Sequence, residues 1–274
     1  MIIPLTVFRY PGGKSKLFKE LFPHLKAGVE SCSIFCEPFT GGGSVSLNIA
    51  QLYPEKQILM NELDEDVFSF WNIVVSGGMG LKMLADKVEK CKPSIQQYKD
   101  LKDTKPSEQL DKAFKAIFFN RCSYSGISIG GPLGGFSQKS KYAIHCRWNA
   151  AALSISMLVQ HRLLAGRTKV TNQDFRTTIT EVPEDAFTYC DPPYYQKGSQ
   201  LYKHAFFEND HHDLRELLSS RKNWALSYDK CAEIDELYDG FPSVDISGQY
   251  SINKKAGASA KEQLILPLRR NYEQ

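Results

Sequence analysis

One segment near the N-terminus constrains the fold more than any other. An apolar run at Ser33–Cys36 leads into the turn Thr40–Ser44, which contains three consecutive glycines. Residues 45–53 have helical character, and a second apolar run, Gln57–Met60, is followed closely by the acid Glu62. Strand, glycine turn, helix, strand and acid in this order open a doubly wound α/β sheet. We therefore predict a Rossmann-like α/β sheet with helices on both faces.

Further helices and strands are predicted on both sides of this segment. A helix is predicted over 14–28, because Leu17, Leu21 and Leu25 fall at i, i+4 and i+8, and another is predicted over 150–164. The further predicted strands lie near residues 169–171, 187–190, 224–227 and 262–266.

The middle of the chain has a different character. Residues 111–119 have helical spacing, whereas 121–148 are rich in Gly, Ser, Pro and aromatic residues, which indicates loops and a hairpin. We therefore assign residues 1–74 and 150–274 to a catalytic core and residues 75–149 to an inserted, mainly helical and hairpin lobe.

The charge of the chain is small but unevenly distributed. The net charge is only +3 over 274 residues, yet no Asp or Glu occurs from Lys112 through Gln173. A basic stretch without acids is a plausible binding surface for a polyanion such as DNA. The alternative is a solvated basic face with no partner. The positive residues of the stretch are Lys112, Lys115, Arg121, Lys139, Lys141, Arg147, Arg162, Arg167 and Lys169.

Several classes of protein are disfavoured by what the sequence lacks. No apolar run approaches the ~20 residues that span a bilayer, and the first residues do not form a signal peptide, so we expect a cytoplasmic protein that does not bind membranes. The seven cysteines include no C-x-x-C pair, so we expect reduced, mostly buried thiols rather than zinc or disulfides. His211 and His212 are expected to start a solvated helix, and no metal site is predicted.

The sharpest chemical signal is Asp191-Pro192-Pro193-Tyr194, directly after an apolar run. The carboxyl ends of strands are where α/β sheets bind ligands. Pro193 has no N–H, which leaves the carbonyl of Pro192 without a neighbouring donor. The Asp191 carboxylate and this carbonyl can together accept both hydrogens of an exocyclic amine, which frees the lone pair of its nitrogen for attack. Catalysis would then come from positioning and electrostatics, with Tyr194 stacking on the base.

The glycine turn predicts the second half of the site. Backbone N–H groups and the following helix N-terminus favour an anion. The turn lacks the lysine ending of a phosphate-binding loop, so the carboxylate of a methionine moiety fits better than a nucleotide phosphate. Glu62, at the end of the second strand, can accept both hydroxyls of a ribose.

Three motifs carry a family resemblance. In chain order, Phe8–Lys14, Glu37–Val45 and Asp191–Tyr194 resemble the Dam-like alpha group of N6-adenine DNA methyltransferases. Shorter segments that resemble the same group are Asn120-Arg121 and Trp148-Asn149, beside its target-recognition lobe, and Asn172–Phe175, beside its cofactor adenine. The resemblance covers nearly the whole chain. It implies an S-adenosylmethionine-dependent enzyme that methylates N6 of adenine in double-stranded DNA.

The resemblance also assigns residues to roles. It places Asp191, Pro192 and Tyr194 at the target adenine and Glu62 at the cofactor ribose, where the family often has Asp. The other residues expected in the cofactor site are Tyr10, Lys14, Phe39, Gly41, Gly43, Asp174 and Phe175. The enzyme is expected to be a monomer associated with nucleoid DNA, and a partner restriction endonuclease is left open.

An adenine inside a duplex must be extruded to reach a buried pocket. Our candidates for phosphate and groove contacts lie in or near the loop and hairpin of residues 123–146, and they are Arg121, Tyr124, Lys139, Lys141 and Arg147. Tyr124, Phe136 or Tyr142 could fill the gap left by the base, although a core position is expected for each. The basic loop Tyr250–Gly257, with Lys254 and Lys255, is a further candidate for the DNA backbone.

Other methylation reactions, and an inactive relative, are alternatives to the adenine chemistry. Cytosine-C5 methylation uses a cysteine nucleophile, usually in a Pro-Cys pair, and the chain contains no such pair. Cytosine-N4 methylation uses the same amine chemistry, but such enzymes commonly have Ser where this chain has Asp191. RNA or protein-glutamine methylation can use a related motif, and the basic lobe argues against a protein substrate. A catalytically inactive DNA-binding relative would have lost the acid, yet Asp191 and Lys14 are both present.

Overall fold

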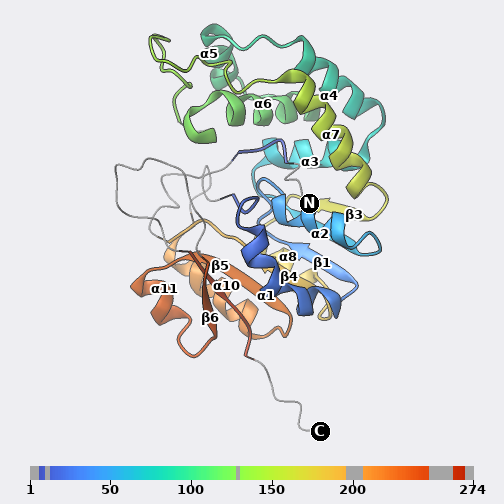
Figure 1. Ribbon diagram of the computed structural model, residues 1–274, viewed down its shortest axis with the longest axis vertical. Helices are drawn as coiled ribbons and strands as arrows, with labels where there is room; N and C mark the ends of the chain where they lie inside the picture. Colours follow the sequence, from blue (N-terminus) through green and yellow to red (C-terminus); the bar gives the residue numbers. More distant parts are fainter. Residues whose placement is uncertain (1–5, 10–12, 128–129, 196–205, 247–261, 269–274) are drawn as a thin grey trace.

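A single seven-stranded sheet organises the protein. The computed structural model describes residues 6–9, 13–127, 130–195, 206–246 and 262–268. The strands are β1 (Ile34–Glu37), β2 (Gln57–Asn61), β3 (Thr168–Thr171), β4 (Phe187–Cys190), β5 (Trp224–Asp229), β6 (Ser243–Ile246) and β7 (Glu262–Ile265). Their order across the sheet is β3-β2-β1-β4-β5-β7-β6 (Figure 1).

The order of the strands determines where a site can form. Strands β3, β2, β1, β4 and β5 are parallel, whereas β7 runs antiparallel between β5 and β6. The chain moves outward from β1 to β3 and then returns to place β4 beside β1. Such a reversal of strand order leaves a crevice at the carboxyl ends of the two central strands. Glu37 closes β1 and Asp191 follows β4, so both lie at this crevice.

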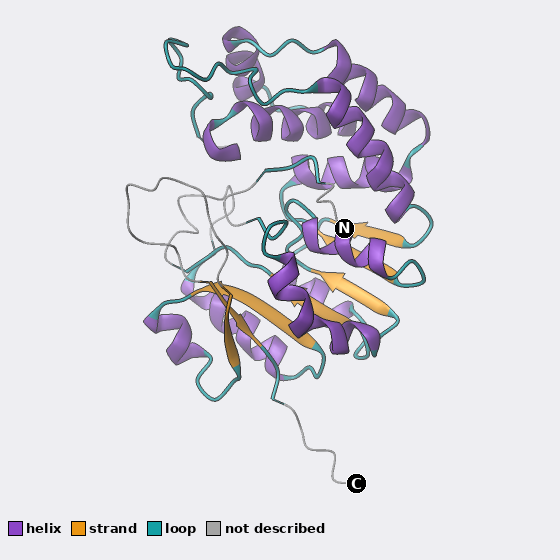
Figure 2. Ribbon diagram, in the orientation of Figure 1, coloured by secondary structure: helices purple, strands orange, loops and turns teal. Residues whose placement is uncertain are grey.

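Helices cover both faces of the sheet (Figure 2). Successive residues of a strand point to opposite faces, and β4 shows this directly: Tyr189 packs with α1 (Phe18–Glu30) and α2 (Ser44–Leu52), whereas Cys190 packs with the opposite helices. Those opposite helices are α8 (Phe175–Glu181), α10 (Glu208–Ser219) and α11 (Ala232–Leu237). The predicted α/β class with helices on both faces is confirmed.

A group of helices packs beside the sheet, at the top of Figure 1. It comprises α3 (Glu65–Ser76), α4 (Gly78–Lys90), α5 (Ile95–Asp103), α6 (Gln109–Cys122) and α7 (Ala150–Leu164). Helix α6 packs along α3, and α4 packs on α7. The buried rings of Tyr98 and Phe119 meet edge to face, with centroids 5.0 Å apart. Residues 75–149 therefore contain α4 to α6, while α3 and α7 join this group to the sheet.

Three details differ from the sequence-based expectations. Helix α1 begins at Phe18 rather than at residue 14, and β6 was not predicted. The hairpin expected after α6 is reduced, among the described residues, to one antiparallel bridge between Ser123 and Pro132. A short 3-10 turn, η1 (Tyr124–Gly126), and glycines with left-handed φ angles at Gly126, Gly134 and Gly135 bend the chain. Such bends prevent two strands from extending side by side.

The histidine pair also behaves differently from expectation. His212 is exposed on α10, but His211 is buried, and its Nδ1 lies 2.5 Å from Tyr228 Oη. Burial lowers the pKa of His211 to about 4. Of the cysteines, Cys146 is exposed, Cys91 is half-buried and the others are buried. Within the described ranges, no helix combines the length and apolar character needed to cross a bilayer.

Candidate active site

Asp191 lies at the open end of the crevice. Strand β4 is fully buried, and the chain leaves it at Asp191, whose side chain is 23% exposed. Lys14 Nζ donates a hydrogen bond to Asp191 Oδ1 over 2.7 Å. Oδ2 of Asp191 accepts no hydrogen bond within the described part of the chain, so it is left for a ligand. Pro192 is buried beneath the turn.

The ammonium of Lys14 is shared among several acceptors. Besides Asp191, it lies 2.5 Å from Glu262 Oε1 and 3.0 Å from Tyr194 Oη. Tyr194 in turn donates its hydroxyl hydrogen to Glu262 Oε1 over 2.6 Å. The side chains of Lys14 and Glu262 are 3% and 4% exposed. A buried lysine, two carboxylates and a phenol thus form one network, which we call the Lys14 network (Lys14, Asp191, Tyr194 and Glu262).

The network changes the acidity of its members. Burial raises the pKa of Asp191 to about 6, the charge of Lys14 opposes this rise, and Glu262 adds to it. The pKa of Lys14 is raised well above its usual value: burial acts in the opposite direction, but the negative charges around the ammonium prevail. Lys14 is therefore a permanent cation near neutral pH, and Asp191 is ionised above about pH 6.

Glu37 is a second buried carboxyl group at the crevice, at the end of β1. It accepts hydrogen bonds from Ser46 N, at 3.1 Å, and from the hydroxyl of Ser46 in the first turn of α2. Burial raises the pKa of Glu37 to about 8, although the bonds from Ser46 oppose this rise. Glu37 is therefore a neutral acid at pH 7.

The glycine turn and Glu62 meet at the end of β2. Gly41 N donates to Glu62 Oε2 over 2.7 Å, and Asp64 N donates to Glu62 Oε1 over 2.9 Å. Burial raises the pKa of Glu62 to about 7. Gly43 precedes α2 with φ 61°, and a Cβ there would lie 2.5 Å from Trp71 Cζ2. Gly43 therefore packs against Trp71 and does not line the crevice.

Three phenylalanines form an apolar wall next to the turn. The ring centroids of Phe39, Phe175 and Phe206 are 5.3 to 5.8 Å apart. Phe39 follows β1, Phe175 begins α8, and Phe206 precedes α10. Flat apolar rings that converge from three elements make a surface on which a planar heterocycle can stack.

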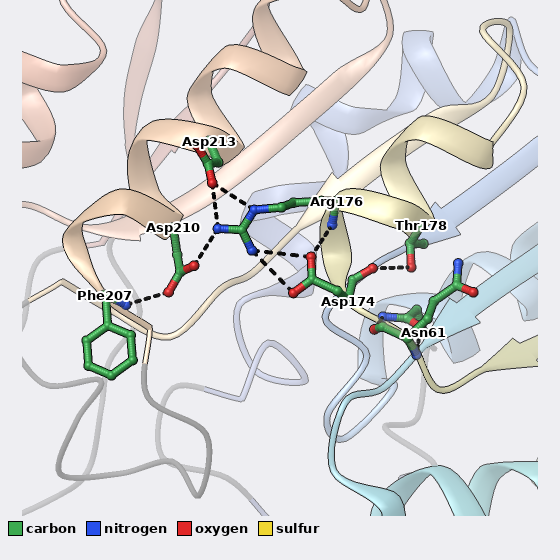
Figure 3. A network of polar contacts seen from close by, with 8 residues as sticks. Asn61, Asp174, Arg176, Thr178, Phe207, Asp210 and Asp213 are labelled. Carbon is green, nitrogen blue, oxygen red and sulfur yellow. Dashed lines mark hydrogen bonds and ion pairs between the residues drawn. The ribbon is translucent and has the colours of Figure 1, made fainter.

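Arg176 links helix α8 to helix α10, as Figure 3 shows. Asp174 caps α8 by accepting from Arg176 N over 2.8 Å. The guanidinium of Arg176 binds Asp174 at 3.2 Å, Asp210 at 2.5 Å and Asp213 at 2.6 Å. Asp210 also accepts from Phe207 N at the start of α10. Asp174 is thus engaged in fixing α8 to α10.

A single cleft of about 1230 Å³ runs between the sheet and the helical group. It joins the end of β4, the glycine turn, the apolar wall and the helical group. The sequence-predicted residues that line it are Lys14, Phe39, Gly41, Glu62, Arg121, Tyr124, Arg147, Asp174, Phe175 and Asp191. Gly43, Pro192, Tyr194, Lys139 and Lys141 do not line it. Tyr10 and the loop Tyr250–Gly257, with Lys254 and Lys255, lie outside the described residues.

The helical side of the cleft is basic. Arg9, Arg121 and Arg147 line it together. Burial, together with the charges of Arg9 and Arg147, lowers the pKa of Arg121 to about 10. None of the three forms an ion pair with an acid in the part of the chain that the structure describes. Three cations held close together without a counter-charge favour a polyanionic ligand.

The aromatic residues of this region are exposed rather than in the core. Tyr124 is 63% exposed, Phe136 54% and Tyr142 53%, so the expectation of core positions was wrong. Tyr124 and Tyr142 line the cleft, whereas Phe136 does not.

An asparagine joins the N-terminal segment to the basic side of the cleft. Asn120 Oδ1 accepts from Arg9 N over 2.7 Å, and its Nδ2 donates to Arg9 O at 3.0 Å and to Gly126 O at 3.2 Å. The side-chain amide therefore pairs with the backbone as a strand would. These three hydrogen bonds hold the turn that contains Tyr124 against the N-terminal segment.

Several residues of the site were not identified from the sequence, among them Glu262 and Arg9. Glu262 is a charged residue at the start of a predicted apolar strand, and that mismatch is the signal that indicates it. Arg9 lies within the first motif, but only the fold brings it to Arg121 and Arg147.

The chain is similar in sequence to a known protein family and to individual proteins. The sequence profile of the D12 class N6 adenine-specific DNA methyltransferases matches residues 10–252. Type II methyltransferase M.MjaIII from Methanocaldococcus jannaschii is 23% identical over 288 residues, which cover 96% of this chain and 98% of that protein. The Retron Ec67 DNA adenine methylase of Escherichia coli is 24% identical over 269 residues, with 95% and 90% covered. Type II methyltransferase M.CviBI from Paramecium bursaria Chlorella virus NC1A is 19% identical over 259 residues, with 93% and 95% covered.

Proposed function

The chain belongs to the D12 class N6 adenine-specific DNA methyltransferase family, and on that premise we propose that it transfers a methyl group from S-adenosylmethionine to an adenine extruded from double-stranded DNA. The observation that carries the proposal is the single cleft that contains both Asp191 and the glycine turn. A methyl donor and an amine acceptor can therefore meet within one cavity. Site-specific action within the duplex and the roles of individual residues are part of the proposal.

The residues around the glycine turn suit S-adenosylmethionine. The apolar wall of Phe39, Phe175 and Phe206 offers a stacking surface for the adenine ring. Glu62 is held by Gly41 N and Asp64 N at the end of β2, where an acid can accept ribose hydroxyls. When bound, S-adenosylmethionine supplies a methyl group attached to a positively charged sulfur.

Asp191 and Pro192 are our candidates for gripping the target amine. Lys14 occupies Oδ1 of Asp191, so Oδ2 can accept one hydrogen of the amine while the carbonyl of Pro192 accepts the other. This grip turns the lone pair of the nitrogen toward the methyl group. After transfer the nitrogen carries a surplus proton, and the Asp191 carboxylate is the nearest base. Positioning and electrostatics would supply the catalysis.

Tyr194 would contribute through its fixed ring. Its hydroxyl is bound by Lys14 and Glu262, so the orientation of the ring is determined before any base arrives. Tyr194 does not itself line the cleft, but it is bound to Lys14, which does. We propose that its ring stacks on the extruded adenine, which has lost the stacking of the duplex.

The helical group is proposed to hold the DNA. Arg9, Arg121 and Arg147 would bind phosphates at the mouth of the cleft, and Tyr124, which is largely exposed, is now the preferred candidate to fill the gap left by the base. We keep residues 75–149 as the proposed target-recognition lobe. Lys139 and Lys141 would contact the phosphates that flank the cleft.

The proposal is tested by identifying the product. Purified protein is incubated with S-adenosylmethionine and unmethylated duplex DNA, the DNA is digested to nucleosides, and the nucleosides are identified by mass spectrometry. We expect N6-methyladenine in the wild-type reaction and none with Asp191→Ala, which should still bind the donor. N4-methylcytosine as the product, or full activity of Asp191→Ala, would refute the assignment.

A further inference from the structure

The Lys14 network contains one more carboxylate than the pairing of Asp191 with Lys14 requires. Asp191 and Lys14 alone would form a neutral ion pair, in which the cation cancels most of the charge of the carboxylate. Glu262 lies 2.5 Å from the same ammonium. One ammonium therefore faces two carboxyl groups.

We propose that Glu262 is a positioning residue that takes Lys14 as its own ion-pair partner, so that the carboxylate of Asp191 keeps its negative charge for the target amine. The inference deepens the proposed function and rests on it. Methyl transfer moves positive charge from the donor onto the amine nitrogen. A carboxylate beside that nitrogen stabilises the new charge only if another cation does not already neutralise it.

The geometry supports a role through Lys14 rather than direct contact with substrate. Glu262 opens β7, and its side chain is 4% exposed. Glu262 does not line the cleft, whereas Lys14 and Asp191 do. The bond from Tyr194 Oη to Glu262 Oε1, at 2.6 Å, fixes the second carboxylate in place. Among the described residues, Lys14 and Tyr194 are the contacts that link Glu262 to Asp191.

Among the described residues, several titratable side chains next to Asp191 are uncharged near neutral pH. Burial keeps the pKa of Tyr189, Tyr194 and Cys190 well above their usual values. Glu37, at the end of the neighbouring strand β1, has a pKa raised by burial to about 8. Of the described charged groups, Lys14 lowers the pKa of Asp191 and Glu262 raises it.

The test is Glu262→Gln in the full-length enzyme. The amide keeps the size of the side chain but removes its charge. Because Glu262 raises the pKa of Asp191, its loss should move the acid limb of the kcat–pH profile to lower pH by roughly one unit. The plateau value of kcat should fall at least about tenfold, with little change in KM for donor or DNA. An unmoved acid limb, or a plateau within twofold of wild type, would overturn the proposal.

A second measurement does not depend on activity. Carbon-13 NMR of protein labelled at aspartate carboxyl groups, with Asp191→Asn used to assign the signal, follows the ionisation of Asp191 directly. Its midpoint should fall in Glu262→Gln by the same amount as the acid limb. If the wild-type protein transfers no methyl group, the proposed function fails, but this titration still decides whether Glu262 controls Asp191.

Two further variants complete the test. Asp245→Asn removes a carboxylate from the neighbouring strand β6, where Asp245 pairs with Lys230 at 2.6 Å, and it should leave the midpoint unchanged. Glu262→Asp keeps the charge but withdraws it by one methylene, so it should give a smaller shift in the same direction. If Glu262→Gln does not fold, Glu262→Asp decides, and wild-type behaviour in that variant counts against the proposal.

Discussion

The ammonium of Lys14 and the carboxylate of Asp191 lie 2.7 Å apart although 177 residues separate them in the chain. Lys14 comes from the turn before α1, and Asp191 follows the central strand β4. The ion pair leaves one oxygen of Asp191 available and keeps its ionisation within the range that enzyme assays can follow.

The rate of methylation should therefore rise with pH through the ionisation of Asp191. Its pKa is raised by burial to about 6, and the ionised form is both the stronger acceptor for the hydrogens of the amine and the form that can take up the surplus proton. At pH 5 the value of kcat should be about one tenth of its plateau value. Single-turnover rates from pH 4.5 to 8 test this. A flat profile over this range would show that Asp191 does not act as an ionised group.

Glu37 should make the free energy of unfolding depend on pH. Its pKa is about 8 in the folded protein and near 4.5 when unfolded, so the folded state binds more protons between these values. Its contribution to stability is full below about pH 4.5 and is lost as the pH rises to 8. Glu37→Gln should remove this loss, worth on the order of a few kcal/mol. Urea unfolding at pH 5 and pH 8 measures it, with the exposed Glu236→Gln as control.

Arg147 should contribute to DNA affinity mainly through charge. It lines the cleft together with Arg9 and Arg121. Arg147→Ala should weaken DNA binding and reduce the slope of log K against log salt by about one. Lys82→Ala, which removes an exposed lysine of α4 away from the cleft, provides the matched control. Identical salt slopes for Arg147→Ala and wild type would exclude a phosphate contact.

Phe39 should contribute to binding of the methyl donor. Its ring contacts both Phe175 and Phe206 in the apolar wall. Phe39→Ala should raise the dissociation constant for S-adenosylmethionine about tenfold, which corresponds to roughly 1.4 kcal/mol, without changing DNA affinity. Calorimetric titration measures this, and Phe136→Ala, at an exposed ring outside the cleft, should bind the donor as wild type does. Equal affinities in the two variants would contradict the stacking role.

The two glycines of the turn should respond differently to substitution. Gly41 and Gly43 both have left-handed φ angles, but a Cβ at Gly41 has no neighbour within 4 Å, whereas one at Gly43 meets Trp71. Gly41→Ala should cost about 1–2 kcal/mol from backbone strain. Gly43→Ala should cost roughly 1–3 kcal/mol more because Trp71 must move. Chemical denaturation compares them, and equal losses would show that Trp71 yields without cost.

Much of the fold could be predicted because its signals are local. The alternation of strand, glycine turn, helix and acid between residues 33 and 62 depends on neighbours in sequence, and it predicted β1, α2 and β2 within one or two residues. The family was also predictable, because the motifs at Phe8–Lys14, Glu37–Val45 and Asp191–Tyr194 are continuous in the chain.

Features that depend on partners distant in sequence could not be predicted in this way. The exposure of Tyr124 and Tyr142 depends on whether the loop between residues 123 and 148 finds a surface to cover. The burial of His211, on helix α10, depends on contact with Tyr228 from strand β5. Amino-acid composition predicts neither the exposure of these tyrosines nor the burial of His211.

The sequence by itself determined the strand, glycine turn, helix and strand between residues 33 and 62 and the family of the chain, because each is encoded in short runs of residues. Only the tertiary structure decided that Glu262 lies against Lys14, and that Arg9, Arg121 and Arg147 line the same cleft. Side chains on separate elements meet only when the sheet is assembled, and burial and neighbouring charges then change their pKa values. The charge state of Asp191 is therefore a property of the fold rather than of the motif that contains it.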